Sequence, residues 1–417
     1  MLVAHSLGRL IQVGTLRVVD ANGRTHVFGD GKGPRSTIRL HDPRLHHRLF
    51  FRPSLALGEG YMDGTLTIEE GDLYGFLDLV LGNLDRLESS GRKHPVQAFY
   101  ETIQRWARPL RTFNPAARAK RNVAHHYDLS GRLYDLFLDK DRQYSCAYFT
   151  SGNESLEIAQ DNKKRHIASK LLLEPGVRIL DIGSGWGGLA LFLARTTKDA
   201  RVTGVTLSEE QVKVARARAA EAGLAERVNF ELTDYRKVDQ PFDRIVSVGM
   251  FEHVGPNHYV EFFRKVKDLL TDDGVCLLHS IGRSDGPGAT GPWLRKYIFP
   301  GGYSPALSEA VAAIEKVGLW ITDVEILRLH YAKTLNEWRR RFMLNRDEVK
   351  ALYDERFCRM WEFYLAGCEA AFHHLRQMVF QVQITKRLET APLTRDYMVD
   401  WERAHGGEGD LSAGSRA

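Results

Sequence analysis

The sequence contains no long hydrophobic run. No apolar stretch approaches the length of about 18 residues or more that a transmembrane helix needs. The first residues, Met1 to Gly14, lack the charged start, the long apolar middle and the cleavage site of a signal peptide. These two absences predict a cytoplasmic protein that has no membrane-spanning helix.

Cysteine is scarce. The sequence has four cysteines, and none of them forms a CxxC pair or a zinc-site spacing. They are Cys146, Cys276, Cys358 and Cys368. This usage is typical of free thiols in a reducing compartment, so neither a disulfide scaffold nor a metal site is predicted.

Charge is balanced except in one segment. The 417 residues carry a net charge of +5, with 43% hydrophobic and 27% charged residues, which is ordinary for a soluble protein of two domains. The segment from Arg92 to Arg121 holds eight Lys or Arg residues and one acidic residue, Glu101. Such a local excess argues against a general nucleic-acid binder and favours one anionic contact surface.

A glycine-rich stretch stands at the centre of the sequence. Val177 to Asp181 reads as a buried strand, the glycines follow as Gly183-x-Gly185-x-x-Gly188, and Leu189 to Arg195 has helical character. Glycines let the backbone approach a ligand, and the start of a helix offers free N–H groups. The spacing by itself also fits a dinucleotide-binding loop.

The end of the next strand distinguishes a dinucleotide-binding loop from a loop that binds S-adenosylmethionine. A nicotinamide dinucleotide requires an acidic residue about 20 residues after the glycines to bind the ribose. At that position the sequence has Thr206 and Ser208, and the first acid, Glu209, already lies in the following helix. This argues against NAD and favours a methyltransferase that binds S-adenosylmethionine (SAM).

The protein divides into four segments. Strands at 16–20, 25–28 and 36–40 and helices at 44–51 and 73–87 predict a small N-terminal α+β module. The predicted segments are a lipid- or membrane-associated α+β domain at 1–110, a basic linker at 111–121, a SAM-dependent catalytic domain with a C-terminal helical cover at 122–390, and a disordered tail at 391–417.

Pro95 to Leu110 has the pattern of an amphipathic helix. Its apolar side chains fall on one face, with Arg105, Arg108 and Arg111 beside them. Such a helix can lie on an anionic bilayer, or its apolar face can pack against the next domain. The sequence leaves both interpretations open.

From Val123 onward, strand and helix patterns alternate. The predicted strands are Val177–Asp181, Val202–Thr206, Val228–Leu232, Arg244–Val248 and Val275–Ser280. This alternation predicts a doubly wound parallel sheet, with a ligand site where the carboxyl ends of the strands meet. Aromatic-rich helical stretches at 335–343 and 353–386 are expected to cover that opening. The fold class is therefore α/β, a Rossmann-like methyltransferase domain with a smaller N-terminal α+β domain.

Further motifs carry a family resemblance. They are Val123-Ala-His-His-Tyr-Asp-Leu129, Gln143-Tyr-Ser-Cys-Ala-Tyr-Phe149, Gly204-Val-Thr-Leu-Ser-x-x-Gln211, the segment 242–255, Leu277-Leu-His-Ser-Ile281 and His330-Tyr-Ala-Lys-Thr-Leu335. With the glycine loop, they closely resemble cyclopropane-fatty-acyl-phospholipid synthases, and the related mycolic acid cyclopropane synthases share much of the pattern. The resemblance covers residues 120 to 385 strongly, and the N-terminal module is similar only to the bacterial phospholipid-acting branch.

The resemblance implies an activity. These enzymes transfer the SAM methyl group to the cis double bond of an unsaturated acyl group, and the resulting carbocation loses a proton as the cyclopropane ring closes. The family uses a bound bicarbonate ion as the base. The positions implied to hold that ion are Cys146, Glu252, His279, Tyr331 and the backbone amide of Ile281. Each of these residues alone has an ordinary structural explanation. Their occurrence together, in the order that the family has, favours a functional role.

The resemblance also implies the SAM contacts. They are Tyr144, Ser145, Asp181, Gly183, Gly185, Thr206, Gln211, Asp234 and Tyr235. Thr206 and Gln211 suit the ribose hydroxyls, and Asp234 and Tyr235 suit the adenine. Ser184 stands where some family members have Cys, in a loop that is otherwise defined by its backbone.

Two alternatives to a cyclopropane synthase stay open. One is a C-methyltransferase that acts on acyl chains and gives a methyl or methylene branch. The other, of a different class, is a non-catalytic lipid-binding protein on the same fold. The expected partner is a phospholipid bilayer with unsaturated acyl chains, which the enzyme would meet from the cytoplasm as a peripheral protein on the inner face. No nucleic acid is expected, and a homodimer is compatible with the sequence.

Overall fold

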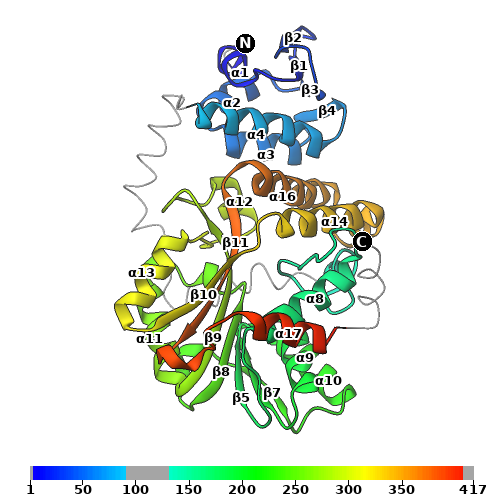
Figure 1. Cartoon of the computed structure of the whole chain (residues 1–417). Coiled ribbons are helices and arrows are strands. Elements are labelled where there is room, and N and C mark those ends of the chain that lie inside the picture. The colour runs from blue at the N-terminus through cyan, green and yellow to red at the C-terminus, as the bar shows by residue number, and fades with distance from the viewer. Residues whose placement is uncertain (1–2, 91–130, 407–417) are drawn as a thin grey trace, which may run out of the picture.

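The computed structural model describes residues 3–90 and 131–406 of the protein. An N-terminal domain lies above a larger α/β domain, and the helices α14 (His330–Leu344) and α16 (Glu355–His374) lie between them (Figure 1). The predicted amphipathic helix, the basic linker and the motif from Val123 to Leu129 lie outside the described residues.

The N-terminal domain is a four-stranded sheet with helices. Its strands stand in the order β2-β1-β3-β4, in which β1 and β3 are parallel and the other two pairs antiparallel. Its elements are α1 (Ala4–Leu10), β1 (Thr15–Val19), β2 (Thr25–Phe28), β3 (Arg35–Leu40), α2 (Leu45–Phe51), α3 (Pro53–Met62), β4 (Leu66–Glu70) and α4 (Leu73–Ser89). The three predicted strands are confirmed, and β4 adds a fourth. Alternation along β3 buries Ile38 and Leu40, as a half-buried strand requires.

The N-terminal domain packs tightly on the catalytic domain. Phe76 and Leu77 of α4 share a hydrophobic cluster with Trp361 of α16. At Gly58 an added Cβ would lie 2.3 Å from the indole nitrogen of Trp293, so only glycine allows this approach. The two domains therefore share one core instead of meeting at a wet surface.

The catalytic domain is built on a seven-stranded sheet. Its order is β10-β11-β9-β8-β5-β6-β7, and β11 alone among these seven strands runs antiparallel to its neighbours. The strands are β5 (Arg178–Ile182), β6 (Arg201–Thr206), β7 (Val228–Leu232), β8 (Phe242–Val248), β9 (Leu270–Arg283), β10 (Trp320–Ile326) and β11 (Gln377–Thr385). The described helices are α7 (Gly131–Asp135), α8 (Leu156–Ser169), α9 (Gly188–Thr196), α10 (Glu209–Glu221), α11 (Tyr259–Leu269), α12 (Pro292–Tyr297), α13 (Leu307–Val317), α14, α15 (Arg346–Leu352), α16 and α17 (Asp396–Ala404). This is the predicted Rossmann-like α/β fold.

Two predictions about the C-terminal part are wrong. The stretch 353–386 does not form helix throughout, because α16 ends at His374 and β11 follows. From Met378 to Thr385 every residue of β11 is buried, so this strand runs through the core of the sheet. The segment is rich in β-branched residues, which favour a strand over a helix. The aromatic residues of α16 continue into β11, so composition alone does not mark the point where helix gives way to strand.

The tail is not disordered from residue 391 either. Residues 396–404 form α17, whose Met398 is buried and whose Glu402 accepts a hydrogen bond from His166 of α8. Trp401 packs against the core beside α9. Apolar side chains at helical spacing dock this segment, although its overall composition is polar.

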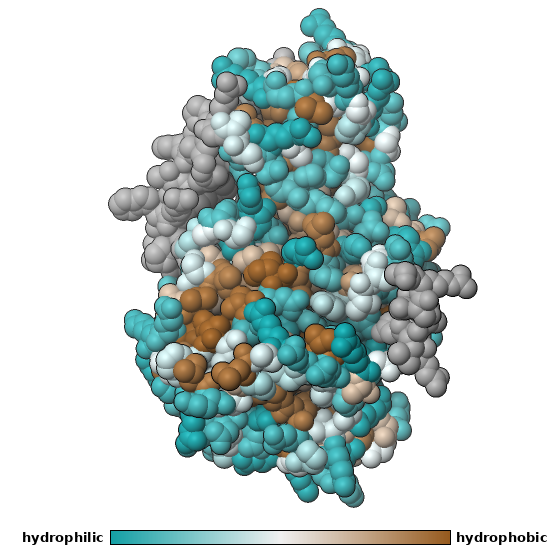
Figure 2. Space-filling view, in the orientation of Figure 1, coloured by the Kyte–Doolittle hydropathy of each residue, from teal (hydrophilic) through white to brown (hydrophobic). Residues whose placement is uncertain are grey.

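Apolar side chains also reach the surface. Figure 2 shows that apolar surface gathers on the catalytic domain more than on the N-terminal domain in this view. Trp320 and Leu329 are each about half exposed. Within residues 3–90 and 131–406, no helix has the length and hydrophobicity to cross a membrane.

Candidate functional site

A pocket lies where the carboxyl ends of the parallel strands meet. Asp181 of β5, Thr206 of β6 and Val248 of β8 all line it, as the topology of a doubly wound sheet requires. All nine residues that the family resemblance implies as SAM contacts line this pocket: Tyr144, Ser145, Asp181, Gly183, Gly185, Thr206, Gln211, Asp234 and Tyr235.

The glycine loop forms one wall of the pocket. Gly183 has a φ of +84° and Gly185 a φ of +54°, in the left-handed region that favours glycine. A Cβ added at Gly183 would lie 2.9 Å from the Cβ of Met250, whereas one added at Gly185 would meet no atom within 4 Å. Gly185 thus borders open space, and α9 begins three residues later with its N–H groups at the loop.

Adding a methyl group at Gly185 should weaken cofactor binding. In Gly185→Ala the new Cβ borders the pocket, and the left-handed backbone is strained by about 1–2 kcal/mol. We expect the Kd for SAM, measured by titration calorimetry, to rise about tenfold, the equivalent of about 1.4 kcal/mol.

The matched control is Gly176→Ala. Gly176 has a φ of +78° and an equally open Cβ position, but it lies before β5 and does not line the pocket. It should lose similar stability and keep its affinity for SAM. Equal weakening by both substitutions would show that backbone strain alone is responsible.

A buried cation stands beside the pocket. Lys163 of α8 lies in the pocket wall, and its Nζ donates to Gln143 Oε1 at 2.6 Å and to Ser145 Oγ at 2.8 Å. Burial lowers the pKa of this lysine to about 8. Across the pocket, burial raises the pKa of Asp181 to about 7, while the charge of Lys163 opposes that rise. The Asp181 Oδ2 atom is buried without a partner. An unpaired carboxylate and an ammonium group together fit the zwitterionic methionine part of SAM.

Neutral and aromatic groups line the rest of the pocket. Thr206 donates to Gln211 Oε1 at 2.8 Å, which leaves the Gln211 amide hydrogens for a ribose hydroxyl. Although burial raises the pKa of Asp234, hydrogen bonds from Arg236 hold it below its usual value. Asp234 is therefore an ionised acceptor next to Tyr235, whose ring offers a flat face for a base.

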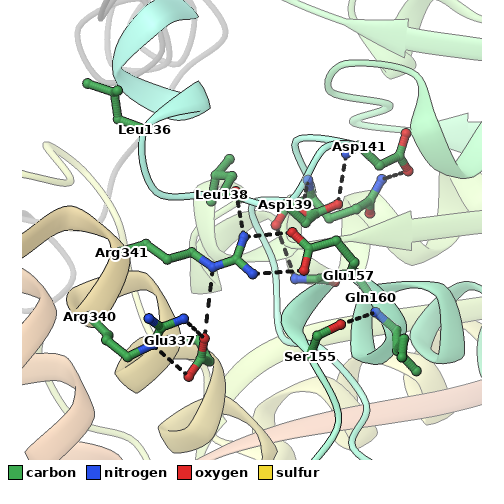
Figure 3. A network of polar contacts seen from close by, with 12 residues as sticks. Leu136, Leu138, Asp139, Asp141, Ser155, Glu157, Gln160, Glu337, Arg340 and Arg341 are labelled. Atoms are coloured by element: carbon green, nitrogen blue, oxygen red, sulfur yellow. Dashed lines mark hydrogen bonds and ion pairs between the residues drawn. The ribbon is translucent and has the colours of Figure 1, made fainter. Parts of the chain in front are cut away.

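A polar network holds the loop that carries Tyr144, Ser145 and Cys146. Figure 3 shows Arg341 of α14 between the Leu138 carbonyl, at 3.1 Å, and the Glu157 carboxylate, at 2.7 Å. Farther along the loop, Gln160 donates to the carbonyl of Ser145 at 3.0 Å. The loop is thus fixed from both α8 and α14.

The residues implied to bind the bicarbonate come from several separate segments. Cys146, Glu252, His279 and Tyr331 are all buried. Glu252, on the turn that follows β8, accepts a hydrogen bond from the Ile281 amide on β9 at 2.7 Å through Oε1. Its other oxygen, Oε2, is buried without a partner.

The Ile281 amide, which the resemblance implies as a contact of the anion, donates to Glu252 in this structure. The reason is geometric, because the turn carries the Glu252 carboxylate across to the neighbouring strand. Ile281 thereby fixes the orientation of this carboxylate.

Burial also sets the protonation states of this group. It raises the pKa of Glu252 to about 7, lowers the pKa of His279 to about 3, and raises the pKa of the Cys146 thiol above its usual range. At neutral pH the thiol and the imidazole are therefore uncharged, and Glu252 alone is poised to exchange a proton.

Aromatic side chains pack against Tyr331, one of these residues, and form an apolar wall around it. Tyr331 of α14 makes edge contacts with Trp338 and Phe372, with ring centroids 5.8 Å and 4.8 Å apart. Tyr144 pairs its hydroxyl with that of Tyr364 at 2.8 Å. Such a wall excludes water from the neighbouring chemistry.

Several residues of the pocket were not found from the sequence. Lys163 gives a usable signal, because it falls on the same face of α8 as Leu156, Gln160 and Ile167, which are all buried. A lysine within a buried helix face requires a polar partner. Arg142, Trp186, Met250 and His253 also line the pocket. Trp186 lies in the glycine loop and Met250 and His253 lie in the segment 242–255, so motifs marked their segments but not their contact with the pocket.

Comparisons with known proteins agree with this geometry. Residues 115–382 match the family described as mycolic acid cyclopropane synthetase, and residues 7–87 match a domain family of unknown function, DUF7884. The cyclopropane-fatty-acyl-phospholipid synthase of Escherichia coli K12 is 38% identical, over 88% of this protein and 92% of that one. A probable fatty acid methyltransferase of Pseudomonas putida is 37% identical, over 83% and 86%.

A solved structure supports the cofactor assignment. The mycolic acid cyclopropane synthase CmaA1, in complex with SAH and CTAB, superposes with a TM-score of 0.60 at 33% identity, covering 65% of this protein and 99% of its own length. Both the sequence and the fold thus support SAM as the cofactor. The chain belongs to the mycolic acid cyclopropane synthetase family and is a SAM-dependent methyltransferase.

Proposed function

We propose that this enzyme transfers a methylene group from SAM to the cis double bond of unsaturated phospholipid acyl chains and forms a cyclopropane ring. The observation that carries the proposal is Glu252, a buried carboxylate with one oriented and one unpartnered oxygen, next to the strand that carries His279. A reaction that ends with loss of a proton requires such an acceptor in a dry site.

The protein's own residues bind, orient and exclude water. SAM, when bound, supplies the methyl cation, and the alkene supplies the electron pair for the new C–C bond while the S–CH₃ bond breaks. The glycine loop and Lys163 fix the methionine part, so that the reactive methyl group is held in place. The aromatic wall with Tyr331 keeps water from the carbocation. The proton then leaves the added methyl group as the ring closes.

The residues present fit a bicarbonate ion as the first acceptor of that proton. Bound bicarbonate would supply a small base that does not add to the cation. The neutral His279 imidazole is a hydrogen-bond donor suited to an anion, and Glu252 Oε2 is an acceptor without a partner. The Cys146 thiol donates to the Ala147 carbonyl at 3.3 Å, and rotation of its S–H bond would turn this donor to the anion. Ionised Glu252 is the group of this protein that takes the proton onward.

A second product class is favoured by one relative. The Pseudomonas putida protein bears the name of a fatty acid methyltransferase. The same cation gives a methyl-branched alkene when a neighbouring chain carbon loses a proton. It gives a methylene branch when a hydride first shifts between the two former alkene carbons and the added methyl group then loses its proton. Incubation with SAM and vesicles of unsaturated phospholipid separates the products. A cyclopropane product gains one CH₂ unit and has no residual double bond, whereas a methylene branch retains one. Failure to consume SAM on any unsaturated lipid would refute both.

We also propose that the enzyme works as a peripheral protein on an anionic bilayer. The basic segment from Arg92 to Arg121 carries a charge excess that attracts anionic lipid by about 1 kcal/mol per residue. Changing Arg105, Arg108 and Arg111 together to Glu should therefore reduce vesicle binding at least tenfold in flotation assays. SAM affinity serves as the control and should not change. Binding that is indifferent to anionic lipid content would contradict this proposal.

A further inference from the structure

A line of hydrogen bonds leads from the C-terminal helix to His279. In the antiparallel pair of β11 and β9, Gln381 stands directly opposite His279, and both are buried. The Gln381 Nε2 atom lies 3.1 Å from His279 Nδ1. The reaction outlined above gives Gln381 no role of its own.

The orientation of the Gln381 amide is fixed by a lysine. Lys170, at the end of α8, donates from Nζ to Gln381 Oε1 at 2.7 Å. An ammonium group has only donors, so the amide oxygen must face Lys170 and the NH₂ group must face the imidazole. Because NH₂ only donates, His279 Nδ1 has to accept. In a neutral imidazole the proton is then on Nε2.

Further charges anchor this lysine. Lys170 pairs with Glu325 of β10, and Glu325 Oε2 also lies 2.6 Å from His166 Nε2. His166 Nδ1 lies 2.5 Å from Glu402 of α17. Lys170, Glu325 and His166 are thus each held by the next group in this line. Because Lys170 cannot move away, the Gln381 amide has only one favourable orientation.

We propose that Gln381, held by Lys170, is a positioning residue that keeps His279 in its Nε2–H tautomer, so that the imidazole donates a hydrogen bond to the anion of the reaction site. The catalytic consequence rests on the proposed function, but the tautomer is a property of the protein alone. It matters because His279 is neutral: its pKa, lowered to about 3 by burial, leaves the ring only one proton to place.

The test replaces the amide by its carboxylate isostere. Gln381→Glu offers only acceptors to Nδ1, so His279 should switch to the Nδ1–H tautomer or take a second proton. Histidine ¹⁵N NMR reads this directly, with His279 assigned by comparison with His279→Gln. We expect kcat to fall about 100-fold, the scale of a misplaced proton donor, with the KM for SAM changed less than threefold. Gln381→Met, which removes both contacts, should show a mixture of tautomers and an intermediate loss.

Gln377→Glu is the matched control. Gln377 lies four residues away on the same face of β11, opposite Arg283 instead of His279, and its Oε1 atom accepts from Ser304 at 3.0 Å, a contact that a carboxylate keeps. It should keep the Nε2–H signal and a kcat within threefold. A native spectrum with Nδ1–H, or a Gln381→Glu enzyme with a switched tautomer and native kcat, would overturn the inference. A native Nε2–H signal that shifts in Gln381→Glu, in a protein inactive on lipid, would support the tautomer and refute the proposed function.

Discussion

Glu252→Gln should lower the rate of transfer from SAM to unsaturated phospholipid by at least about 10³-fold. The amide keeps an oxygen that can accept from the Ile281 amide, so the local structure should persist. What is lost is an oxygen that can take a proton, and a positioned base contributes about 10²–10⁴-fold. Single-turnover assays at saturating SAM measure this loss, and calorimetry should find SAM affinity unchanged, since Glu252 does not line the SAM pocket.

The same role of Glu252 predicts the direction in which the rate changes with pH. Burial raises the pKa of Glu252 to about 7, and only its ionised form can accept a proton. The rate of the native enzyme at saturating SAM should therefore rise as the pH increases through about 7, and the residual rate of Glu252→Gln should lack that rise.

Glu362→Gln is the matched control. Burial also raises the pKa of this carboxylate, which accepts from Tyr61 at the contact between the domains and does not line the pocket. Its activity should stay within threefold of native. If Glu252→Gln kept more than a tenth of the native rate, Glu252 would not be the group of this protein that takes the proton onward.

Much of the fold was accessible from the sequence because local patterns determine it. The five parallel strands from β5 to β9 are short apolar runs between helical segments, and each lies where that pattern indicates. The strand β11 was mistaken for helix because burial on both faces removes the alternation that would mark it. Similarly, α17 depends on contacts of Met398 and Trp401 with distant elements, which composition does not reveal.

The residues that line the cofactor pocket at the strand ends were easier to predict than the side chains that hold them from other elements. Residues at strand ends converge by topology, so Asp181 and Thr206 could be placed from their position alone. Lys163 and Gln381 reach the site from α8 and from the antiparallel strand, and their roles depend on side-chain contacts between elements far apart in the sequence. The hydrogen bond from the Ile281 amide to Glu252 also joins two separate segments of the chain, so the sequence alone does not predict it.

Lys163→Met should weaken SAM binding about 100-fold, equivalent to about 2.7 kcal/mol. Methionine fills a similar volume, but Ser145 and Gln143 lose their donor. The charge that opposes protonation of Asp181 also disappears, so the pKa of Asp181 should rise further above about 7. A neutral Asp181 attracts the SAM ammonium less strongly. Calorimetry with SAM and with adenosine separates the effects, because adenosine lacks the methionine part and should bind as it does to the native enzyme.

The neighbouring lysine supplies the control for this change. Lys164 is also buried on the same turn of α8, but it pairs with Asp141 and Asp161 and does not line the pocket. Lys164→Met should lose stability and keep its SAM affinity within threefold. If both substitutions weakened SAM equally, or if adenosine binding fell with SAM binding in Lys163→Met, the effect would come from general loosening of α8. A selective loss of SAM binding would show that a buried lysine, within hydrogen-bond reach of the loop before α8, holds the methionine end of the cofactor.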